Sequence, residues 1–222
     1  MKIIGLNGSP RKKGNSAVLM EQALLGAREA GAETERIDLS TLQYSGCRSC
    51  FACKRIGPTY GKGCLLKDDL APVLTKLLEA DAWIFSSPIY NGRMSSLMAA
   101  MLERHYFANK TYDKEFRAPT LTRQYPSLMI YNLNGNDDYV KKTGIDVICQ
   151  HDQMLMKALF GPCETLIVTT TLQFDDYSKY HTSGVPLERK MKYHEEQFEL
   201  DLKNAYDGGA NLVRLLENQK NG

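Results

Sequence analysis

The feature that most constrains the fold is an apolar run that leads directly into a loop of glycine, serine and basic residues. Residues 2–6 (KIIGL) are typical of a buried strand, and the loop 8–16 (GSPRKKGNS) follows at once. Gly8 and Gly14 allow the backbone to turn its N–H groups toward one point. The helix predicted to begin near Ser16 adds the positive end of its dipole. This strand–loop–helix unit predicts an α/β protein whose first loop binds a phosphate monoester.

The loop differs from two better known phosphate-binding patterns. In the pattern G-x4-G-K-[ST] a lysine follows the second glycine, whereas Asn15 stands there in this chain. The pattern G-x-G-x-x-G needs a spacing that Gly5, Gly8 and Gly14 do not have. The alternative to a phosphate site is a basic surface loop that only caps the helix. The residues predicted to hold the phosphate are Ser9, Arg11, Gly14, Asn15 and Ser16.

Length and composition are those of an ordinary globular protein. The chain has 222 residues, of which 43% are hydrophobic, and a formal net charge of +2, so no nucleic-acid or membrane partner is expected. No segment approaches the ~20 apolar residues of a membrane span. The N-terminus enters a strand without a signal peptide, which predicts a cytoplasmic location. The six cysteines are then expected to be reduced, metal-bound or catalytic.

Strand-like and helix-like segments alternate along the chain. The predicted strands are 3–6, 34–39, 83–85, 128–133 and 165–171. The predicted helices are 16–30, 70–80, 95–102, 146–160 and 187–219, the last with a break near Gly208 and Gly209. This order predicts an open, doubly wound parallel sheet of five strands with right-handed connections. Two strand orders are common in such sheets, and we adopt the flavodoxin-like order 2-1-3-4-5. We expect one domain over 1–222, with a cysteine-rich loop at 44–64 and a C-terminal helical extension at 187–220.

In that topology three loops converge at the edge where strands one and three part. They are 8–16, 87–95 and 132–136, and all are rich in glycine, serine, asparagine or proline. Ligands of such sheets bind at this edge, so a crevice between the three loops is predicted. Two further connections, 106–125 and 173–185, are long for this fold and are interpreted as lids or as parts of a subunit interface.

A second candidate site is a loop that carries four of the cysteines. These cysteines are Cys47, Cys50, Cys53 and Cys64, and the gaps between them are two, two and ten residues long. Thiolates so spaced can hold a [4Fe-4S] cluster or tetrahedral zinc, and a Cys-x-x-Cys pair can be redox-active. Four reduced thiols without metal are the remaining alternative. Cys149 and Cys163 belong to no motif and are predicted to lie in the core.

These motifs together identify a resemblance. The loop 8–16, the cysteine run and the segment 86–92 (SSPIYNG) occur in this order in the NADPH-dependent FMN reductase-like branch of the flavodoxin superfamily, which the chain resembles over residues 1 to about 104. It is especially similar to the iron–sulfur flavoproteins of anaerobes, although the gap before Cys64 is longer than is usual among them. The resemblance implies FMN, with its 5′-phosphate in the first loop.

The resemblance also implies which residues lie along the rest of FMN. The loop after the third strand is expected to follow the isoalloxazine ring and the ribityl chain, and the loop after the fourth strand to border the ring edge. The residues implied are Pro88, Ile89, Tyr90, Asn91, Gly92, Arg93, Met94, Asn134, Gly135 and Asn136. Tyr90 is interpreted either as a stacking partner of a ring or as a rim residue, and Arg93 either as a contact of a nucleotide phosphate or as a solvated side chain.

The expected function is that of an FMN-dependent oxidoreductase without a catalytic side chain, because the flavin supplies the chemistry. Electrons are expected to enter from NAD(P)H or a ferredoxin-like donor and to leave to a small acceptor such as a quinone, a nitro or azo compound, or an electron carrier. The alternatives are a non-enzymatic electron carrier or redox sensor, and a zinc-stabilised phosphate-binding protein without flavin. The resemblance further implies a homodimer or homotetramer.

Overall fold

Strands and helices alternate along the chain in the expected order. The computed structural model describes residues 1–114, 117–118, 121–184 and 186–221. The strands are β1 (Lys2–Asn7), β2 (Glu33–Asp38), β3 (Ala82–Tyr90), β4 (Arg93–Met94), β5 (Ser127–Asn132) and β6 (Cys163–Val168). The helices are α1 (Asn15–Glu29), α2 (Leu70–Glu79), α3 (Ser96–Asn109), α4 (Asp137–Thr143), α5 (Ile145–Phe160) and α6 (Leu187–Asn221).

The sheet has the predicted topology. Its order is β2-β1-β3-β5-β6, with parallel pairing throughout, and the short β4 pairs antiparallel with the end of β3. Because β4 is only the two-residue return of a hairpin, the five parallel strands follow the expected order 2-1-3-4-5. The predicted flavodoxin-like sheet is confirmed, and β1 and β3 lie side by side at its centre.

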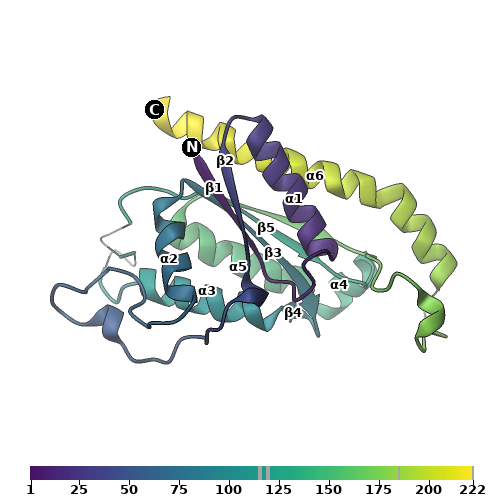
Figure 1. The fold of residues 1–222 in the computed structure, drawn as a ribbon, viewed down its shortest axis with the longest axis horizontal. Helices are drawn as coiled ribbons and strands as arrows, with labels where there is room; N and C mark the ends of the chain where they lie inside the picture. The colour runs from purple at the N-terminus through teal and green to yellow at the C-terminus, as the bar shows by residue number, and fades with distance from the viewer. Residues whose placement is uncertain (115–116, 119–120, 185, 222) are drawn as a thin grey trace.

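Helices cover both faces of the sheet, so alternate residues of each strand enter two separate cores (Figure 1). In β3, Trp83 and Phe85 pack in the core that includes α2, α3 and α5, whereas Ile84 packs in the core that includes α1 and α6. Strands buried on both faces read as continuous apolar runs, which is why residues 3–6 were recognisable as a strand.

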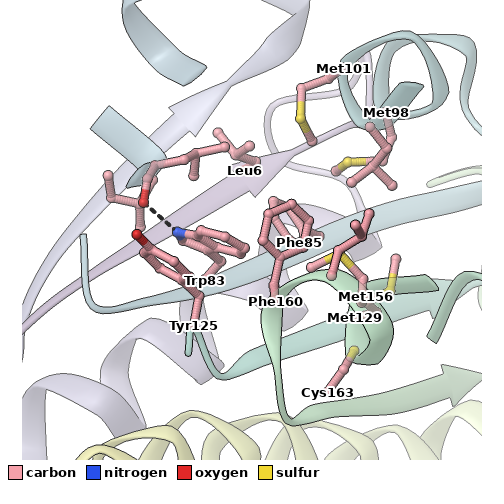
Figure 2. Packing of buried hydrophobic residues seen from close by; sticks show 14 of the residues in the cluster. Leu6, Trp83, Phe85, Met98, Met101, Tyr125, Met129, Met156, Phe160 and Cys163 are labelled. Carbon is pink, nitrogen blue, oxygen red and sulfur yellow. Dashed lines mark hydrogen bonds between the residues drawn. The ribbon is translucent and has the colours of Figure 1, made fainter. Parts of the chain in front are cut away.

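An aromatic cluster fills the first of these cores (Figure 2). The Trp83 ring stacks on Tyr125 at a centroid distance of 4.7 Å, and its Nε1–H donates to the carbonyl of Leu77 at 2.7 Å. His105 of α3 stacks on Phe160 at 4.5 Å, and its burial lowers its pKa to about 3. Sulfur-bearing side chains complete this core, and they are Met98, Met101, Met129, Met156, Cys149 and Cys163. The prediction that the last two are core cysteines is confirmed.

The expected break of the C-terminal helix is wrong. Helix α6 runs without interruption through Gly208 and Gly209 and lies alongside α1. A Cβ atom at Gly209 would lie 1.8 Å from the carbonyl oxygen of Ala23, and one at Gly26 would lie 2.0 Å from the carbonyl oxygen of Tyr206. The glycines therefore serve the close crossing of two helix backbones.

Two expected loops are also partly regular structure. Residues 88–94 form the end of β3, a turn and β4, because Asn91 (φ 50°) and Gly92 (φ 82°) adopt the left-handed conformations that a two-residue hairpin turn needs. The connection expected at 106–125 begins inside α3, and positions 115–116, 119–120 and 185 of the two long connections lie outside the described residues. None of the helices in the described parts of the chain is both long and apolar enough to cross a membrane.

Candidate functional site

The loops that follow β1, β3 and β5 surround a crevice of about 410 Å³ at the carboxyl edge of the sheet. This volume lies within the range of small-molecule sites. The crevice is found where β1 and β3 part, and the segment after β6 forms another of its walls. The predicted residues that line it are Arg11, Asn15, Pro88, Ile89, Tyr90, Asn91, Gly92, Asn134 and Gly135.

Some predicted residues do not line the crevice, and others were missed. Those outside the lining are Ser9, Gly14, Ser16, Arg93, Met94 and Asn136. Asn132 and Leu133, in the predicted loop 132–136, also line it although neither was singled out, and those that sequence reasoning missed are Tyr139, Ile145, Thr171 and Gln173. A signal for the last two existed, because a fifth parallel strand must deliver the residues after it to the same edge.

The two serines of the first loop brace it from beneath. Ser9 is 3% exposed, and its Oγ accepts from the backbone N–H of Arg11 at 3.1 Å. Ser16 is 1% exposed, and its hydroxyl donates to the side-chain oxygen of Asn132 at the end of β5. Its own carbonyl accepts from the hydroxyl of Ser86 at 2.8 Å. Ser16 thus connects the loop to β3 and β5, whereas the Ser9 hydroxyl braces the loop internally.

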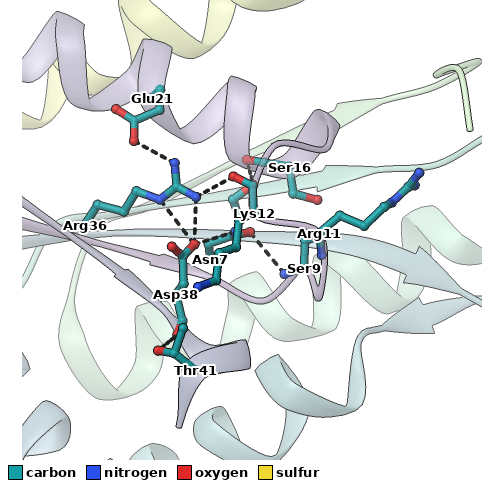
Figure 3. A network of polar contacts seen from close by, with 10 residues as sticks. Asn7, Ser9, Arg11, Lys12, Ser16, Glu21, Arg36, Asp38 and Thr41 are labelled. Carbon is teal, nitrogen blue, oxygen red and sulfur yellow. Dashed lines mark hydrogen bonds and ion pairs between the residues drawn. The ribbon is translucent and has the colours of Figure 1, made fainter. Parts of the chain in front are cut away.

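A polar network anchors the same loop to β2 (Figure 3). Arg36 donates from Nη2 to Asp38 Oδ1 and to the carbonyl of Lys12, both at 2.7 Å. Asn7 donates to Asp38 Oδ1 at 2.8 Å, and its own side-chain oxygen accepts from the N–H of Ser9 at 3.0 Å. Hydrogen bonds to charged groups are the stronger ones, and this network holds the loop at Ser9 and Lys12.

Gly8 has a different role from the one that its sequence context indicates. Neither Gly8 nor Gly14 has a positive φ, so neither is needed for a left-handed turn. A Cβ atom at Gly8 would lie 2.8 Å from Cβ of Met98, and the Gly8 carbonyl accepts from the hydroxyl of Ser95 at 2.6 Å. Ser95 is also the N-cap of α3, and its hydroxyl oxygen accepts from the N–H of Met98. Gly8 therefore lets the first turn of α3 approach the loop.

Cationic and amide donors of the loop reach across the crevice. Arg11 donates from Nη1 to the carbonyl of Gln173 at 2.6 Å, and Asn15 donates to the carbonyl of Leu172 at 2.8 Å. Helix α1 begins at Asn15 after Gly14, which has no side chain to cap the first amides. The N–H of Ala17 donates to the carbonyl of Gly14 at 2.9 Å, and the amides that open such a helix suit an anion. The positive end of α1 therefore lies beside this crevice.

Helix α6 supports the opposite wall. Lys190 is 4% exposed and donates to the carbonyl of Asn134 at 3.1 Å. Burial lowers the pKa of this lysine to about 8. The hydroxyl of Thr169 donates to Asp137 at 2.9 Å and lies 3.2 Å from the hydroxyl of Tyr193. The loop after β5 is therefore held by Thr169, 32 residues after Asp137, and by Lys190, 56 residues after Asn134.

The four cysteines of the second candidate site surround one small cavity of about 20 Å³. Apolar side chains and two arginines complete its walls, and the full lining is Cys47, Arg48, Cys50, Phe51, Cys53, Cys64, Leu65, Leu66, Arg104, Phe107 and Ala108. Burial raises the pKa of the Cys53 thiol. All six cysteines are free, and no three His, Cys, Asp or Glu side chains of the described residues form a metal-holding group. Four thiols around one cavity are nonetheless the donor set that a [4Fe-4S] cluster takes.

Comparison with known proteins places the chain in a family. A model of the NADPH-dependent FMN reductase family matches residues 1–120. The chain belongs to this family. Family membership confirms the expected resemblance and agrees with FMN as the cofactor of the family and NAD(P)H as its co-substrate.

Individual relatives agree with this assignment. The chain is 38% identical over 104 residues to an iron-sulfur flavoprotein of Methanocaldococcus jannaschii, covering 47% of this chain and 51% of the relative. It is 33% identical over 104 residues to an iron-sulfur flavoprotein of Methanosarcina thermophila, covering 47% and 52%. The chain thus matches about half the length of these curated relatives.

Solved structures share the fold across almost the whole chain. An NAD(P)H:quinone oxidoreductase of Methanothermobacter marburgensis superposes with a TM-score of 0.68 at 17% identity, covering 96% of this chain and 98% of that one. An azoreductase of Bacillus anthracis gives a TM-score of 0.64 at 16% identity, covering 95% and 99%. At such identities the likeness establishes the fold alone.

Proposed function

We propose that this chain is an FMN-dependent oxidoreductase that takes electrons from NAD(P)H and passes them to a small acceptor such as a quinone or a nitro or azo compound. The observation that carries the proposal is the convergence of the loops after β1, β3, β5 and β6 on one crevice, at the edge where β1 and β3 part. Membership of the NADPH-dependent FMN reductase family supports it.

The phosphate of FMN is assigned to the first loop. The Arg11 guanidinium, the Asn15 amide and the uncapped first turn of α1 supply positive charge and N–H donors on one side of the crevice. Arginine has five N–H donors, so Arg11 can bind a phosphate while its Nη1 stays on the carbonyl of Gln173. Ser9, Gly14 and Ser16 shape this loop from behind.

The flavin ring is assigned to the space between the hairpin after β3 and the loop after β5. Pro88 to Gly92 line one side, Asn134 and Gly135 line the other, and Arg93, Met94 and Asn136 are their immediate neighbours. Tyr90 lies at the rim, 44% exposed, where its ring can stack on a flat aromatic group. When bound, the flavin supplies the redox chemistry, and the chain's own residues bind it, orient it and shield one face from water.

Two measurements test this function. Titration of the protein with FMN and with riboflavin, followed by quenching of flavin fluorescence, is expected to show tighter binding of FMN. Steady-state assays with NADPH and NADH are expected to show flavin-dependent reduction of a quinone. A protein that binds neither flavin contradicts the proposal, and one that binds FMN without turnover with either nucleotide contradicts the enzymatic part.

A second candidate function is that of an iron–sulfur flavoprotein that carries electrons from a ferredoxin-like donor or senses redox state. The arrangement of Cys47, Cys50, Cys53 and Cys64 around one cavity favours it, as do the names of the curated relatives. These four cysteines would hold a [4Fe-4S] cluster, which supplies one-electron transfer. An anaerobic absorbance spectrum with iron and sulfide analysis tests it, and a colourless preparation that contains zinc would contradict both functions.

We also propose that the protein forms a homodimer or homotetramer, with the cysteine-rich loop, the connection 106–125 and α6 at the interface. Light scattering at working concentration tests this proposal. A monomer would contradict it.

A further inference from the structure

Lys190, near the start of α6, is a cation that is buried without a carboxylate partner. The residue is 4% exposed, and its Nζ donates to the carbonyl of Asn134 at 3.1 Å. No acidic side chain in the described part of the chain forms an ion pair with it. Burial lowers its pKa to about 8, so the ammonium group is still mostly charged at pH 7.

Two features of this position disfavour a positive charge. Moving an ammonium group out of water is costly unless an opposite charge compensates it. Helix α6 begins at Leu187, so Lys190 also lies in the first turn, where the helix dipole favours anions. One hydrogen bond to a neutral carbonyl offsets only part of this cost. A cation kept in such a place is typical of a functional site.

The carbonyl that Lys190 contacts belongs to the wall of the crevice to which the flavin ring is assigned. Asn134 and Gly135 line that crevice, and Lys190 contacts this wall without lining the crevice itself. The side-chain oxygen of Asn134 is buried and has no hydrogen-bond partner among the described residues, so the wall offers an acceptor to a ligand N–H. Burial and Lys190 lower the pKa of His194, one turn along α6, so this histidine adds no charge at pH 7. Lys190 therefore places one positive charge behind this wall.

Reduction of a flavin creates a negative charge that this lysine can stabilise. A hydride from NAD(P)H carries two electrons and one proton, so the nucleotide leaves as NAD(P)⁺ and the flavin keeps one added hydrogen and one negative charge. A fixed positive charge in a protein interior stabilises such a charge more strongly than it would in water. A cation close to the ring therefore favours the reduced flavin and raises its reduction potential.

We propose that Lys190 is a positioning residue of the flavin site, which holds the carbonyl of Asn134 and raises the reduction potential of FMN by stabilising the reduced, anionic form. This inference deepens the proposed function and rests on the assignment of the flavin to this crevice. It gives a role to α6, which lies outside the residues 1–120 that the family model matches.

The test compares five full-length proteins at pH 7: wild type, Lys190→Gln, Lys190→Met, Lys190→Arg and Lys192→Gln. Glutamine keeps a donor for the carbonyl of Asn134 but removes the charge, whereas arginine keeps both. Lys192→Gln is the matched control, because Lys192 carries the same charge on the same helix but its side chain is 74% exposed. Anaerobic equilibration with redox dyes gives the midpoint potential of bound FMN, and fluorescence quenching gives the affinity for oxidised FMN.

Lys190→Gln is expected to bind oxidised FMN as tightly as the wild type but to be harder to reduce, by about tenfold in the two-electron equilibrium constant, or ~30 mV. Lys190→Arg and Lys192→Gln are expected to keep the wild-type potential. Lys190→Met has no donor and no charge, and it carries the comparison if Lys190→Gln does not bind FMN.

Four outcomes would overturn the inference. An unchanged potential in Lys190→Gln shows that the lysine only holds Asn134 in place. An equal shift in Lys192→Gln shows a general effect of net charge, and a shift in Lys190→Arg as large as that in Lys190→Gln shows that the charge is not the cause. Loss of oxidised FMN from both neutral variants shows that the lysine serves binding and not the potential. A wild-type protein that binds no FMN is a different result, because it removes the proposed function and this inference with it.

Discussion

The crossing of α1 and α6 allows a prediction with a built-in control. Alanine at Gly209 places its Cβ atom 1.8 Å from the backbone oxygen of Ala23, where ordinary contacts begin near 3.4 Å. The two helices would have to separate by more than 1 Å. Alanine at the adjacent Gly208 meets only the end of the Leu128 side chain, at 2.9 Å, which can rotate away.

The two substitutions gain the same helix propensity, about 1 kcal/mol over glycine in each case. Overpacking against backbone costs about 1–3 kcal/mol. Gly209→Ala is therefore expected to unfold with a free energy lower than that of Gly208→Ala by about that amount. Urea denaturation followed by circular dichroism measures the difference, with unchanged m-values as a check on two-state unfolding. If Gly209→Ala is as stable as Gly208→Ala, the close crossing of the two helices is refuted.

Three further outcomes are expected. Arg11→Met is expected to weaken FMN binding about tenfold, because one charge-assisted hydrogen bond is lost, and to leave riboflavin binding unchanged. An equal loss of affinity for both flavins in the fluorescence titration would place the phosphate elsewhere. Asp38→Asn breaks the network behind the first loop, whereas Glu21→Gln removes only the outer ion pair of Arg36. Asp38→Asn is therefore expected to lower FMN affinity more than Glu21→Gln, and equal affinities would show that the network does not support the site. His105→Phe is expected to flatten the pH dependence of stability. Burial lowers the pKa of His105 from 6.5 to about 3, so between those pH values only the unfolded chain binds this proton, and wild-type stability falls by about 1.4 kcal/mol per pH unit below 6.5. Urea unfolding of both proteins at pH 7 and pH 5 measures this loss, and an identical loss in the two proteins contradicts the prediction.

The local elements were predictable because their signals are short in range. Helix α1 departs by only one residue at each end from the segment predicted at 16–30. Helix α3 begins at Ser96, one residue after the start predicted at 95. The hairpin at Asn91 and Gly92 carried an equally local signal, the Asn-Gly pair, which the reading of 88–94 as a loop overlooked.

Long-range packing explains the remaining differences. Gly208 and Gly209 read as a helix break because glycine lowers helix propensity, but the partner that needs them is α1, some 180 residues earlier in the chain. Nothing in the local sequence marks His105 and Arg104 as buried groups. Only the positions of Phe160 and of Cys64 and Asp68 turn them into buried groups.

The sequence alone determined the alternation of strands and helices and the open parallel sheet, and the adopted flavodoxin-like order then gave the edge at which the loops meet. These follow from hydrophobic period, turn chemistry and the handedness of connections, which act locally or by general rule. Tertiary structure decided which donors line the crevice and which brace it, as Arg11 and Ser16 show. It also decided how the four cysteines come together around one cavity beside Arg104, because such contacts depend on distances between segments that no local pattern encodes.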